Sequence, residues 1–263
     1  MRNLGEKRNR RKKRNSRKKR TCRIATALLW GMFLFGTAIP AFAGQETSSQ
    51  ESFSKEPGSA VIEGIIQPQN LEAAREADQM IVAVGTGGCK AQVFYYKKGE
   101  TEWELAWQED AVVGKNGITG RKAEGDKSTP SGTYGLTMSF GLKEDPGSIL
   151  PYHTIVQGDY WVDDPSSPYY NQLVNICQIS KNWDSAEDMA SASPYYDYGL
   201  ALDYNKECVP GKGSAIFLHC FTASPDSGSA GCIRLPESRM RELVQSATER
   251  TKVVIAADLS QLK

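Results

Sequence analysis

The chain has 263 residues, with 32 basic and 31 acidic side chains and a formal net charge of +1. Apolar residues make up 40% of the chain and charged residues 24%, and five tryptophans are present. This composition excludes a disordered polymer, a collagen and a multi-span membrane protein, and the length suits one or two domains with a sizeable buried core.

The charge is divided unevenly between the first residues and the rest of the chain. Residues 1–23 hold 13 Lys or Arg and a single acid, Glu6, which gives a charge of +12. Residues 44–263 hold 19 bases and 30 acids, which gives −11. Basic tails also bind nucleic acid, but a basic run placed directly before an apolar span favours a role in membrane orientation. We therefore expect no nucleic-acid partner.

Twenty uncharged residues follow the basic run, residues 24–43, and they read IATALLWGMFLFGTAIPAFA. A positive segment, an apolar segment and a small-x-small ending are the three parts of a secretory signal. Because about 20 apolar residues also cross a hydrocarbon core of about 30 Å, the span alternatively serves as an uncleaved anchor. We expect residues 1–43 to be a signal peptide or single-span membrane anchor, and the protein to be exported to the cell envelope or secreted.

The next segment, residues 44–60, is rich in Ser, Glu and Gln and nearly lacks large apolar residues. Such a segment buries too little apolar surface to offset the entropy of ordering, so we expect a flexible linker. Residues 61–263 then form the globular domain.

Five cysteines lie in this exported part: Cys89, Cys177, Cys208, Cys220 and Cys232. In an oxidising compartment four of them have three possible pairings, and the fifth thiol stays free. Cys208 and Cys220 are attractive partners because a Pro-Gly-Lys-Gly turn lies between them. The alternative is that these cysteines are small, buried apolar residues.

Short β-branched or aromatic runs, separated by Gly, Pro, Asn and Asp, dominate the globular part. They predict strands over residues 80–84, 92–97, 103–108, 132–137, 153–157, 173–179, 199–203, 215–219 and 251–256. Helical spacing predicts a short helix over residues 70–80 and a surface helix over 236–250. The pattern favours a mainly-β fold, a β-sandwich or barrel-like pair of sheets with a few short peripheral helices.

The densest local signal is residues 214–235, which read SAIFLHCFTASPDSGSAGCIRL. A strand delivers His219 at its end, and a loop of small residues leads from there to Cys232. A thiol reacts as its thiolate, and a neighbouring imidazole that takes the proton activates it. We therefore expect Cys232 to be a nucleophile and His219 its base.

Two residues near Cys232 extend this hypothesis. Gly231 has no side chain to block an approaching carbonyl group, so backbone N–H groups at Gly231 and Cys232 are candidates for binding an oxyanion. Arg234 lies two residues beyond Cys232, on the same strand face, and a guanidinium suits a carboxylate. Together these residues indicate acyl transfer.

The segment resembles the signature of the L,D-transpeptidase catalytic domain (YkuD-type), which has a His, a loop, and then Ser/Thr-x-Gly-Cys followed by an apolar residue and Arg or Asn. Three further stretches agree with this family: residues 125–136 (GDKSTPSGTYGL), 160–171 (YWVDDPSSPYYN) and 213–219 (GSAIFLH). The resemblance covers roughly residues 80–257, and four motifs in the right order make chance agreement unlikely.

The resemblance implies that Cys232 is the nucleophile, that His219 is the general base, and that the main-chain carbonyl of Cys220 orients the imidazole. Arg234 and Ser229 are expected to contact substrate. In the implied reaction the thiol attacks a diamino-acid carbonyl linked to terminal D-Ala in a peptidoglycan stem peptide. D-Ala leaves, and an amine of a second stem peptide resolves the thioester.

One position departs from the family pattern. Many members have His directly before the Gly-Cys pair, where this chain has Ala230. We interpret this as a branch of the family, because base, nucleophile, glycine and Arg all remain. Two alternatives stay open: an L,D-carboxypeptidase or endopeptidase acting on the same stem peptides, and a non-catalytic wall-binding domain.

The remaining candidate residues have simpler interpretations. His153 has no partner motif and is interpreted as structural, and Asp163 and Asp164 as turn acceptors. The aromatic residues Tyr160, Trp161, Tyr169 and Tyr170 either line a groove or form a half-buried β surface. No Cys-x-x-Cys or His-x₃-His spacing is present, so we expect neither a metal nor a cofactor.

Overall fold

The computed structural model describes residues 66–221 and 227–262. The chain divides into two units, Met1–Phe53 and Ser54–Lys263, and all the described residues belong to the second. The leader, the linker and the start of the domain at residue 61 lie outside the described residues and stay predictions. Among the residues that the structure describes, no helix is both long and apolar enough to cross a bilayer.

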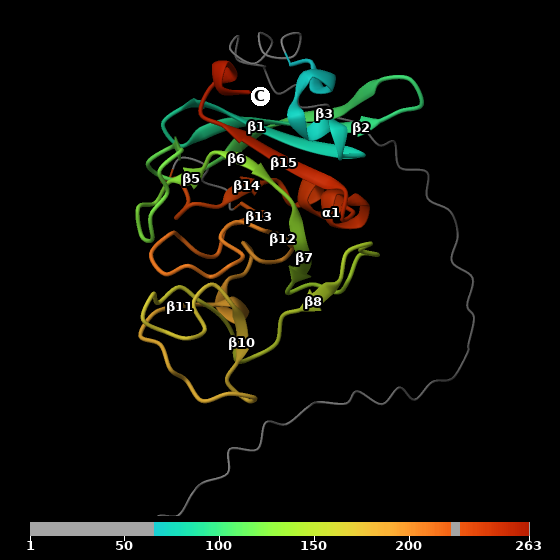
Figure 1. The fold of residues 1–263 in the computed structure, drawn as a ribbon. Helices are drawn as coiled ribbons and strands as arrows, with labels where there is room; N and C mark the ends of the chain where they lie inside the picture. The colour runs from blue at the N-terminus through green and yellow to red at the C-terminus, as the bar shows by residue number, and fades with distance from the viewer. Residues whose placement is uncertain (1–65, 222–226, 263) are drawn as a thin grey trace, which may run out of the picture. The chain divides into compact units, whose positions relative to one another are not determined.

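A mixed sheet of ten strands dominates the fold, in the order β6-β15-β1-β2-β3-β14-β13-β12-β7-β8 (Figure 1). The strands are β1 (Gln79–Gly87), β2 (Lys90–Lys98), β3 (Trp103–Val112), β6 (Gly132–Tyr134), β7 (Leu136–Gly141), β8 (Tyr152–Thr154), β12 (Gly199–Leu202), β13 (Phe217–Cys220), β14 (Ile233–Leu235) and β15 (Thr251–Ala256). The prediction of a mainly-β fold is therefore confirmed.

This sheet curls back on itself. Strand β6 lies at one edge of the strand order and β7 lies next to the other edge, yet a single residue, Gly135, separates them in the chain. Only two Cα–Cα steps of about 3.8 Å each link Tyr134 to Leu136, so the two ends of the sheet must approach each other. Contacts between β15 and β7 agree with this. The sheet is barrel-like, as predicted.

Two smaller sheets complete the strand structure. One has the order β10-β9-β11, with β10 (Leu173–Asn175), β9 (Asp159–Val162) and β11 (Ala186–Asp188). The other pairs β4 (Ile118–Thr119) with β5 (Thr129–Pro130). In Figure 1, β10 and β11 lie at the opposite end of the domain from β1–β3, with β12, β13 and β14 between. The sequence prediction missed strands β9 and β11, although it found β8 and β10, which are just as short.

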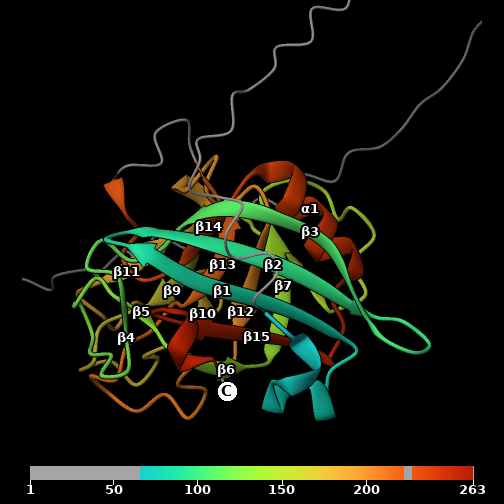
Figure 2. The ribbon, with the colours of Figure 1, turned by 90° about the horizontal axis from the view of Figure 1, so that it is seen from above.

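The interior of the curled sheet holds the largest apolar cluster. Helix α1 (Glu237–Ser246) contributes Met240, Leu243 and Val244 to it, all on one helical face, and Figure 2 shows this helix beside the end of β3. The helix starts after Pro236, which suits a first turn because it lacks an N–H to satisfy. It ends at Ser246, since Ala247 is extended, so the predicted helix over residues 236–250 is four residues too long at its C-terminal end.

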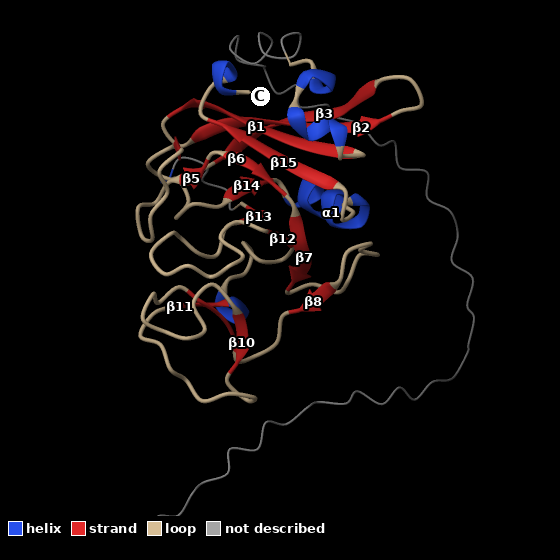
Figure 3. Cartoon of the chain, in the orientation of Figure 1, coloured by secondary structure: helices blue, strands red, loops and turns tan. Residues whose placement is uncertain are grey.

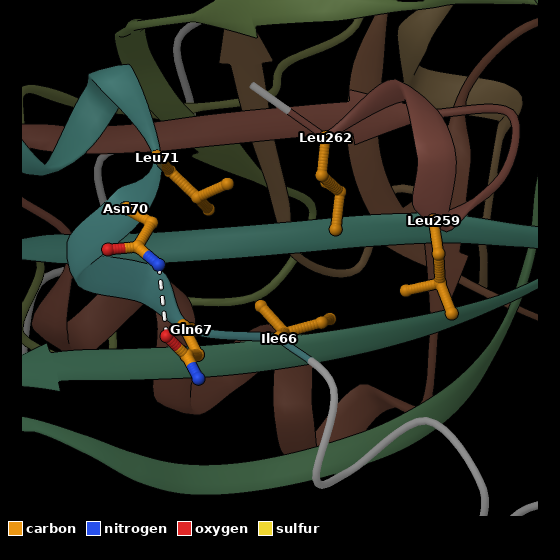
Figure 4. Close-up of a pocket in the computed structure, with 6 residues that line it drawn as sticks. All are labelled: Ile66, Gln67, Asn70, Leu71, Leu259 and Leu262. Atoms are coloured by element: carbon orange, nitrogen blue, oxygen red, sulfur yellow. Dashed lines mark hydrogen bonds between the residues drawn. The ribbon is translucent and has the colours of Figure 1, made fainter.

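The expectation of one short helix over residues 70–80 is wrong. Two 3-10 helices, Pro68–Asn70 and Glu72–Arg75, stand there (Figure 3), because Leu71 between them is extended and the chain enters β1 at Gln79. They cover a second apolar cluster on β1, β2 and β15. Figure 4 shows a pocket at this cluster, lined by Ile66, Gln67, Asn70, Leu71, Leu259 and Leu262, none of which is a predicted site residue.

The suggested disulfide between Cys208 and Cys220 does not form, since both are free thiols. Cys220 belongs to β13 and points into the main core, where its Sγ lies 3.6 Å from the carbonyl oxygen of Tyr198. Cys208 lies in a loop, with its Sγ 3.8 Å from the carbonyl oxygen of Asn171. Cys220 therefore fits the alternative interpretation, a small buried apolar residue.

The same Ile→Ala change should affect stability differently at a buried and at an exposed position. Ile81, in β1, is fully buried, whereas Ile149 is 63% exposed. Because a large-to-small change in a packed core leaves a cavity, Ile81→Ala should lower the free energy of unfolding by about 3 kcal/mol. The matched change Ile149→Ala should alter it by less than about 0.5 kcal/mol. Urea unfolding followed by circular dichroism measures both, and equal losses would contradict this description of the core.

Candidate active site

Strands β13 and β14 place the predicted nucleophile and base on one face of the sheet. The two strands run parallel, with His219 opposite Arg234 and Leu218 opposite Ile233. Side chains alternate along a strand, so Leu218 and Ile233 enter the main core while His219 and Arg234 project to the other face. Cys232, two residues before Arg234, shares that second face. The structure thus brings together residues 13 positions apart in the chain.

The Cys232 side chain is enclosed, with 8% of the residue exposed. Its Sγ donates to the carbonyl oxygen of Ala215 at 3.1 Å and accepts the N–H of Phe217 at 3.4 Å. Burial, and next the negative charge of Glu187, raise the pKa of the thiol to about 12. The Cys232 side chain is therefore a neutral thiol at pH 7.

The imidazole of His219 is oriented by the main chain. Its Nδ1 lies 2.7 Å from the carbonyl oxygen of Cys220, and a carbonyl only accepts hydrogen bonds, so Nδ1 carries the proton and Nε2 is the basic nitrogen. The rings of Tyr195 and Tyr196 meet it edge-on, with centroids 5.8 and 5.2 Å away. Burial lowers the pKa of His219 to about 4, against the opposing effect of the Cys220 carbonyl. The imidazole of His219 is therefore neutral at pH 7.

Among the described residues, no hydrogen bond joins Cys232 to His219. The thiol proton points to Ala215 instead, so proton transfer to Nε2 requires the Cys232 side chain to turn from this carbonyl toward the imidazole. Hydrogen bonds between catalytic groups are often absent in a ligand-free enzyme and form only with substrate.

The loop before Cys232 is fixed by hydrogen bonds of its own. The hydroxyl of Ser229 donates to the Cys232 carbonyl oxygen at 2.5 Å and accepts the N–H of Gly231 at 3.0 Å. Thr129, from the predicted 125–136 motif, donates its hydroxyl to the Gly231 carbonyl oxygen at 2.8 Å. Ser229 therefore braces the loop, and its hydroxyl has no spare proton for substrate. An oxyanion role for the Gly231 N–H requires its bond to Ser229 to open.

Gly231 is also required by space and by backbone conformation. Its φ of +152° lies where side chains are rarely accommodated, and an added Cβ would lie 3.0 Å from the Ser128 carbonyl oxygen. The same Cβ would lie 3.1 Å from Cδ1 of Ile216. Because Gly231 has no side chain, the loop can lie close to Ser128 and Ile216.

Arg234 is a cation that no described acid neutralises by direct contact. Its guanidinium carbon lies 4.7 Å above the Tyr195 ring, and its buried Nε has no hydrogen-bond partner in the described part of the chain. The nearby Glu187, on β11, accepts a hydrogen bond from the Tyr196 hydroxyl at 3.1 Å. Burial raises the pKa of the Glu187 carboxyl. An uncommitted guanidinium beside the thiol suits a carboxylate ligand.

Sequence reasoning missed Glu187 and Tyr196. Neither belongs to a motif, and both reach the site only because the β9–β11 sheet packs against β13. Phe217 of β13 makes this packing contact. The centroid of its ring lies 4.7 Å from that of Trp161 and 5.9 Å from that of Tyr196. Only the fold brings these residues to Cys232.

Two further candidate residues, His153 and Asp164, bond to groups other than the thiol. His153 bonds through Nε2 to the Asp159 carboxylate at 2.8 Å. Asp164 accepts from the N–H groups of Ser166 and Asp184, both at 2.8 Å, as a turn acceptor does.

The aromatic residues of the 160–171 block separate into two groups. Trp161 and Tyr170 are buried, while Tyr160 and Tyr169 are half-buried and pack around Trp183. Within residues 66–221 and 227–262, no group of three or more His, Cys, Asp or Glu side chains is arranged to hold a metal ion.

Several solved structures are similar to this chain. A Bdellovibrio bacteriovorus protein is 15% identical, with 70% of this chain and 50% of that chain covered and a TM-score of 0.37. An L,D-transpeptidase from Stackebrandtia nassauensis is 13% identical, with 73% and 61% covered and a TM-score of 0.34. A mutant of the Enterococcus faecium L,D-transpeptidase is 16% identical, with 68% and 49% covered and a TM-score of 0.33. The chain thus spans about half to three fifths of these proteins.

No curated protein matches the sequence. The family model of the L,D-transpeptidase catalytic domain (YkuD), however, matches residues 79–255. This range agrees closely with the span of roughly 80–257 that the sequence motifs indicated, and it takes in His219, Cys232 and Arg234. Since the match covers well over half of the chain, the protein belongs to the L,D-transpeptidase catalytic domain family.

Proposed function

We propose that this protein is an exported cysteine acyltransferase that forms peptidoglycan cross-links as an L,D-transpeptidase. The observation that carries the proposal is the arrangement of Cys232, His219 and Arg234 on one face of β13 and β14, with Nδ1 of His219 held by the Cys220 carbonyl. A thiol, an oriented base and an anion-binding group are the parts that acyl transfer to a carboxylate-bearing peptide needs.

The first half of the reaction forms a thioester. The Cys232 side chain turns to His219, Nε2 takes the thiol proton, and Sγ bonds to the carbonyl carbon that precedes the terminal D-Ala. The C–N bond to D-Ala then breaks, and His219 returns the proton to the leaving amine. Arg234 holds a carboxylate of the donor stem and thereby fixes its carbonyl group near Sγ.

The second half resolves the thioester. An amine of another stem peptide attacks the thioester carbonyl, His219 accepts a proton from it, and the thiol is released as Sγ regains a proton. The predicted exported part carries −11, which favours the approach of a cationic amine over an anionic wall polymer. Residues 1–43 direct the protein to the envelope or beyond, as a signal peptide or an anchor.

Burial determines how the proton moves. Because the imidazole and the thiol both have pKa values shifted toward their neutral forms, the resting site holds no separated thiolate and imidazolium. The proton therefore transfers as the substrate binds and Sγ attacks. Low exposure at Cys232 also keeps water from the thioester, which favours aminolysis over the hydrolysis that a carboxypeptidase would perform.

Loss of the nucleophile gives the first test. Cys232→Ala should abolish cross-linking of purified muropeptides, and it should also abolish the covalent adduct that a carbapenem acyl donor forms, because the Cys220 thiol next to His219 points into the main core on the opposite face of β13. Mass spectrometry of the intact protein and of its peptides locates the adduct.

Cys208→Ala is the matched control, since it removes a free thiol whose described hydrogen bonds go to the main-chain carbonyl oxygens of Asn171 and Lys206, and it should behave as wild type. Full activity of Cys232→Ala would overturn the mechanism. Free stem tripeptide without cross-links would assign the carboxypeptidase reaction instead. Binding to sacculi without any adduct would assign a wall-binding domain.

The buried imidazole gives a second test, in the pH dependence of acylation. A base works only while unprotonated, so the rate should fall as pH drops through the pKa of His219, about 4, and not near the ordinary value of about 6.5. The rate of carbapenem adduct formation from pH 7 to pH 3.5 measures this. Circular dichroism at each pH shows that the protein stays folded. A midpoint near 6.5 in folded protein would contradict the buried neutral base.

A further inference from the structure

The block of residues 160–171 ends in Asn171, whose side chain connects three parts of the chain. Its Oδ1 accepts the indole N–H of Trp161 and the backbone N–H of Ala215, each at 3.0 Å. Its Nδ2 donates to the carbonyl oxygens of Asn205 at 2.9 Å and Tyr204 at 3.3 Å. All four hydrogen-bonding positions of the amide are thus occupied.

Ala215, one of these partners, has an unusual backbone conformation. Its φ is +52°, in the left-handed region, which costs a residue with a Cβ roughly 1 kcal/mol or more. A surrounding structure must stabilise such a residue, and the bond from its N–H to Asn171 does so. The carbonyl oxygen of Ala215 is the acceptor for the Cys232 thiol. Two consecutive hydrogen bonds therefore lead from Asn171 through Ala215 to Sγ of the nucleophile.

The neighbouring residues fix the same segment from the same side. The Tyr170 hydroxyl accepts the N–H of Gly213 at 3.0 Å, and the Ser214 hydroxyl donates to the Glu124 carboxylate at 2.7 Å. Tyr170 also donates to that carboxylate. Residues 213–215 are therefore held as a unit by the 160–171 block and by Glu124.

The consequence for the thiol is a fixed position. Sγ lies between the carbonyl of Ala215 and the N–H of Phe217, one an acceptor and the other a donor. The carbonyl favours the protonated thiol, whereas the N–H favours the thiolate. Moving Ala215 would release the first contact and leave the second.

We propose that Asn171 is a positioning residue for the nucleophile: its side chain holds Ala215 in the left-handed conformation that directs the Ala215 carbonyl at Sγ of Cys232. Asn171 does not touch the reacting atoms. The inference rests on the proposed function, because it assigns Asn171 a part in acylation of that thiol, and it assigns the 160–171 block a role beyond packing.

The test replaces Asn171 by glycine, because Asn171 itself has a φ of +55° and glycine keeps that backbone conformation without strain. Asn175→Gly is the matched control. The Asn175 side chain also bonds within the small sheet, to the Cys177 N–H and to Asp159, but not to residues 213–217.

Two rates are measured for each protein: carbapenem acylation of Cys232, and iodoacetamide alkylation of Cys232 relative to Cys220. Cys220 lies on the opposite face of β13 and reports any general loosening of this strand. Melting temperatures are recorded alongside.

We expect opposite changes in Asn171→Gly. Acylation should slow by about tenfold or more, because a misplaced reacting group loses the geometry of attack. The Cys232 to Cys220 alkylation ratio should rise about three- to tenfold, because loss of the carbonyl acceptor leaves the N–H of Phe217, which favours the thiolate. Asn175→Gly should match wild type in both rates.

Unchanged acylation in Asn171→Gly would overturn the inference. So would equal acceleration of Cys220 and Cys232 alkylation, since that result describes a loosened strand. A wild-type protein that forms no adduct at all would instead contradict the proposed function. In that case the alkylation ratio still decides whether Asn171 positions the thiol.

Discussion

The parallel pairing of β13 with β14 is the constraint on which the rest of the site depends. Leu218 and Ile233 lie opposite each other in this pairing and are fully buried in the main core. Because side chains alternate, burying them forces His219, Cys232 and Arg234 to the other face. A slip of one residue would exchange core and site residues. The packing energy of the core therefore also keeps Cys232 and His219 on the same face.

Enclosure of that face determines its chemistry. Trp161 and Tyr196 pack around Phe217, and the enclosed thiol and imidazole both favour their neutral forms. The face therefore holds no preformed thiolate and imidazolium pair, and the Cys232 thiol is directed at the Ala215 carbonyl instead of at His219. Arg234 stacks on Tyr195, and no described acid contacts its guanidinium, so a positive charge remains on this face.

The 160–171 block shows how a segment without a reacting group contributes to such a site. Its Asn171 reaches Ala215 across 44 positions of sequence, and its Tyr170 reaches Glu124 across 46. These bonds connect the small sheet to residues 213–215, which directly precede β13. The 160–171 block, which the sequence describes as a turn with aromatic residues, thus fixes the segment that leads into β13, the strand of His219.

The sequence by itself determined the mainly-β class and the family, and it indicated Cys232 and His219 as the candidate nucleophile and base, because alternation, turn residues and short motifs are local patterns. The helix predicted over residues 70–80 is wrong because Leu71 is extended and divides the segment into two 3-10 helices. The suggested pairing of Cys208 with Cys220 is wrong because both side chains are free thiols, although a turn lies between them in the sequence. Only the tertiary structure decided that Ser229 braces its own loop and that Glu187 lies near the thiol. Such contacts depend on packing between distant segments, which no local pattern records.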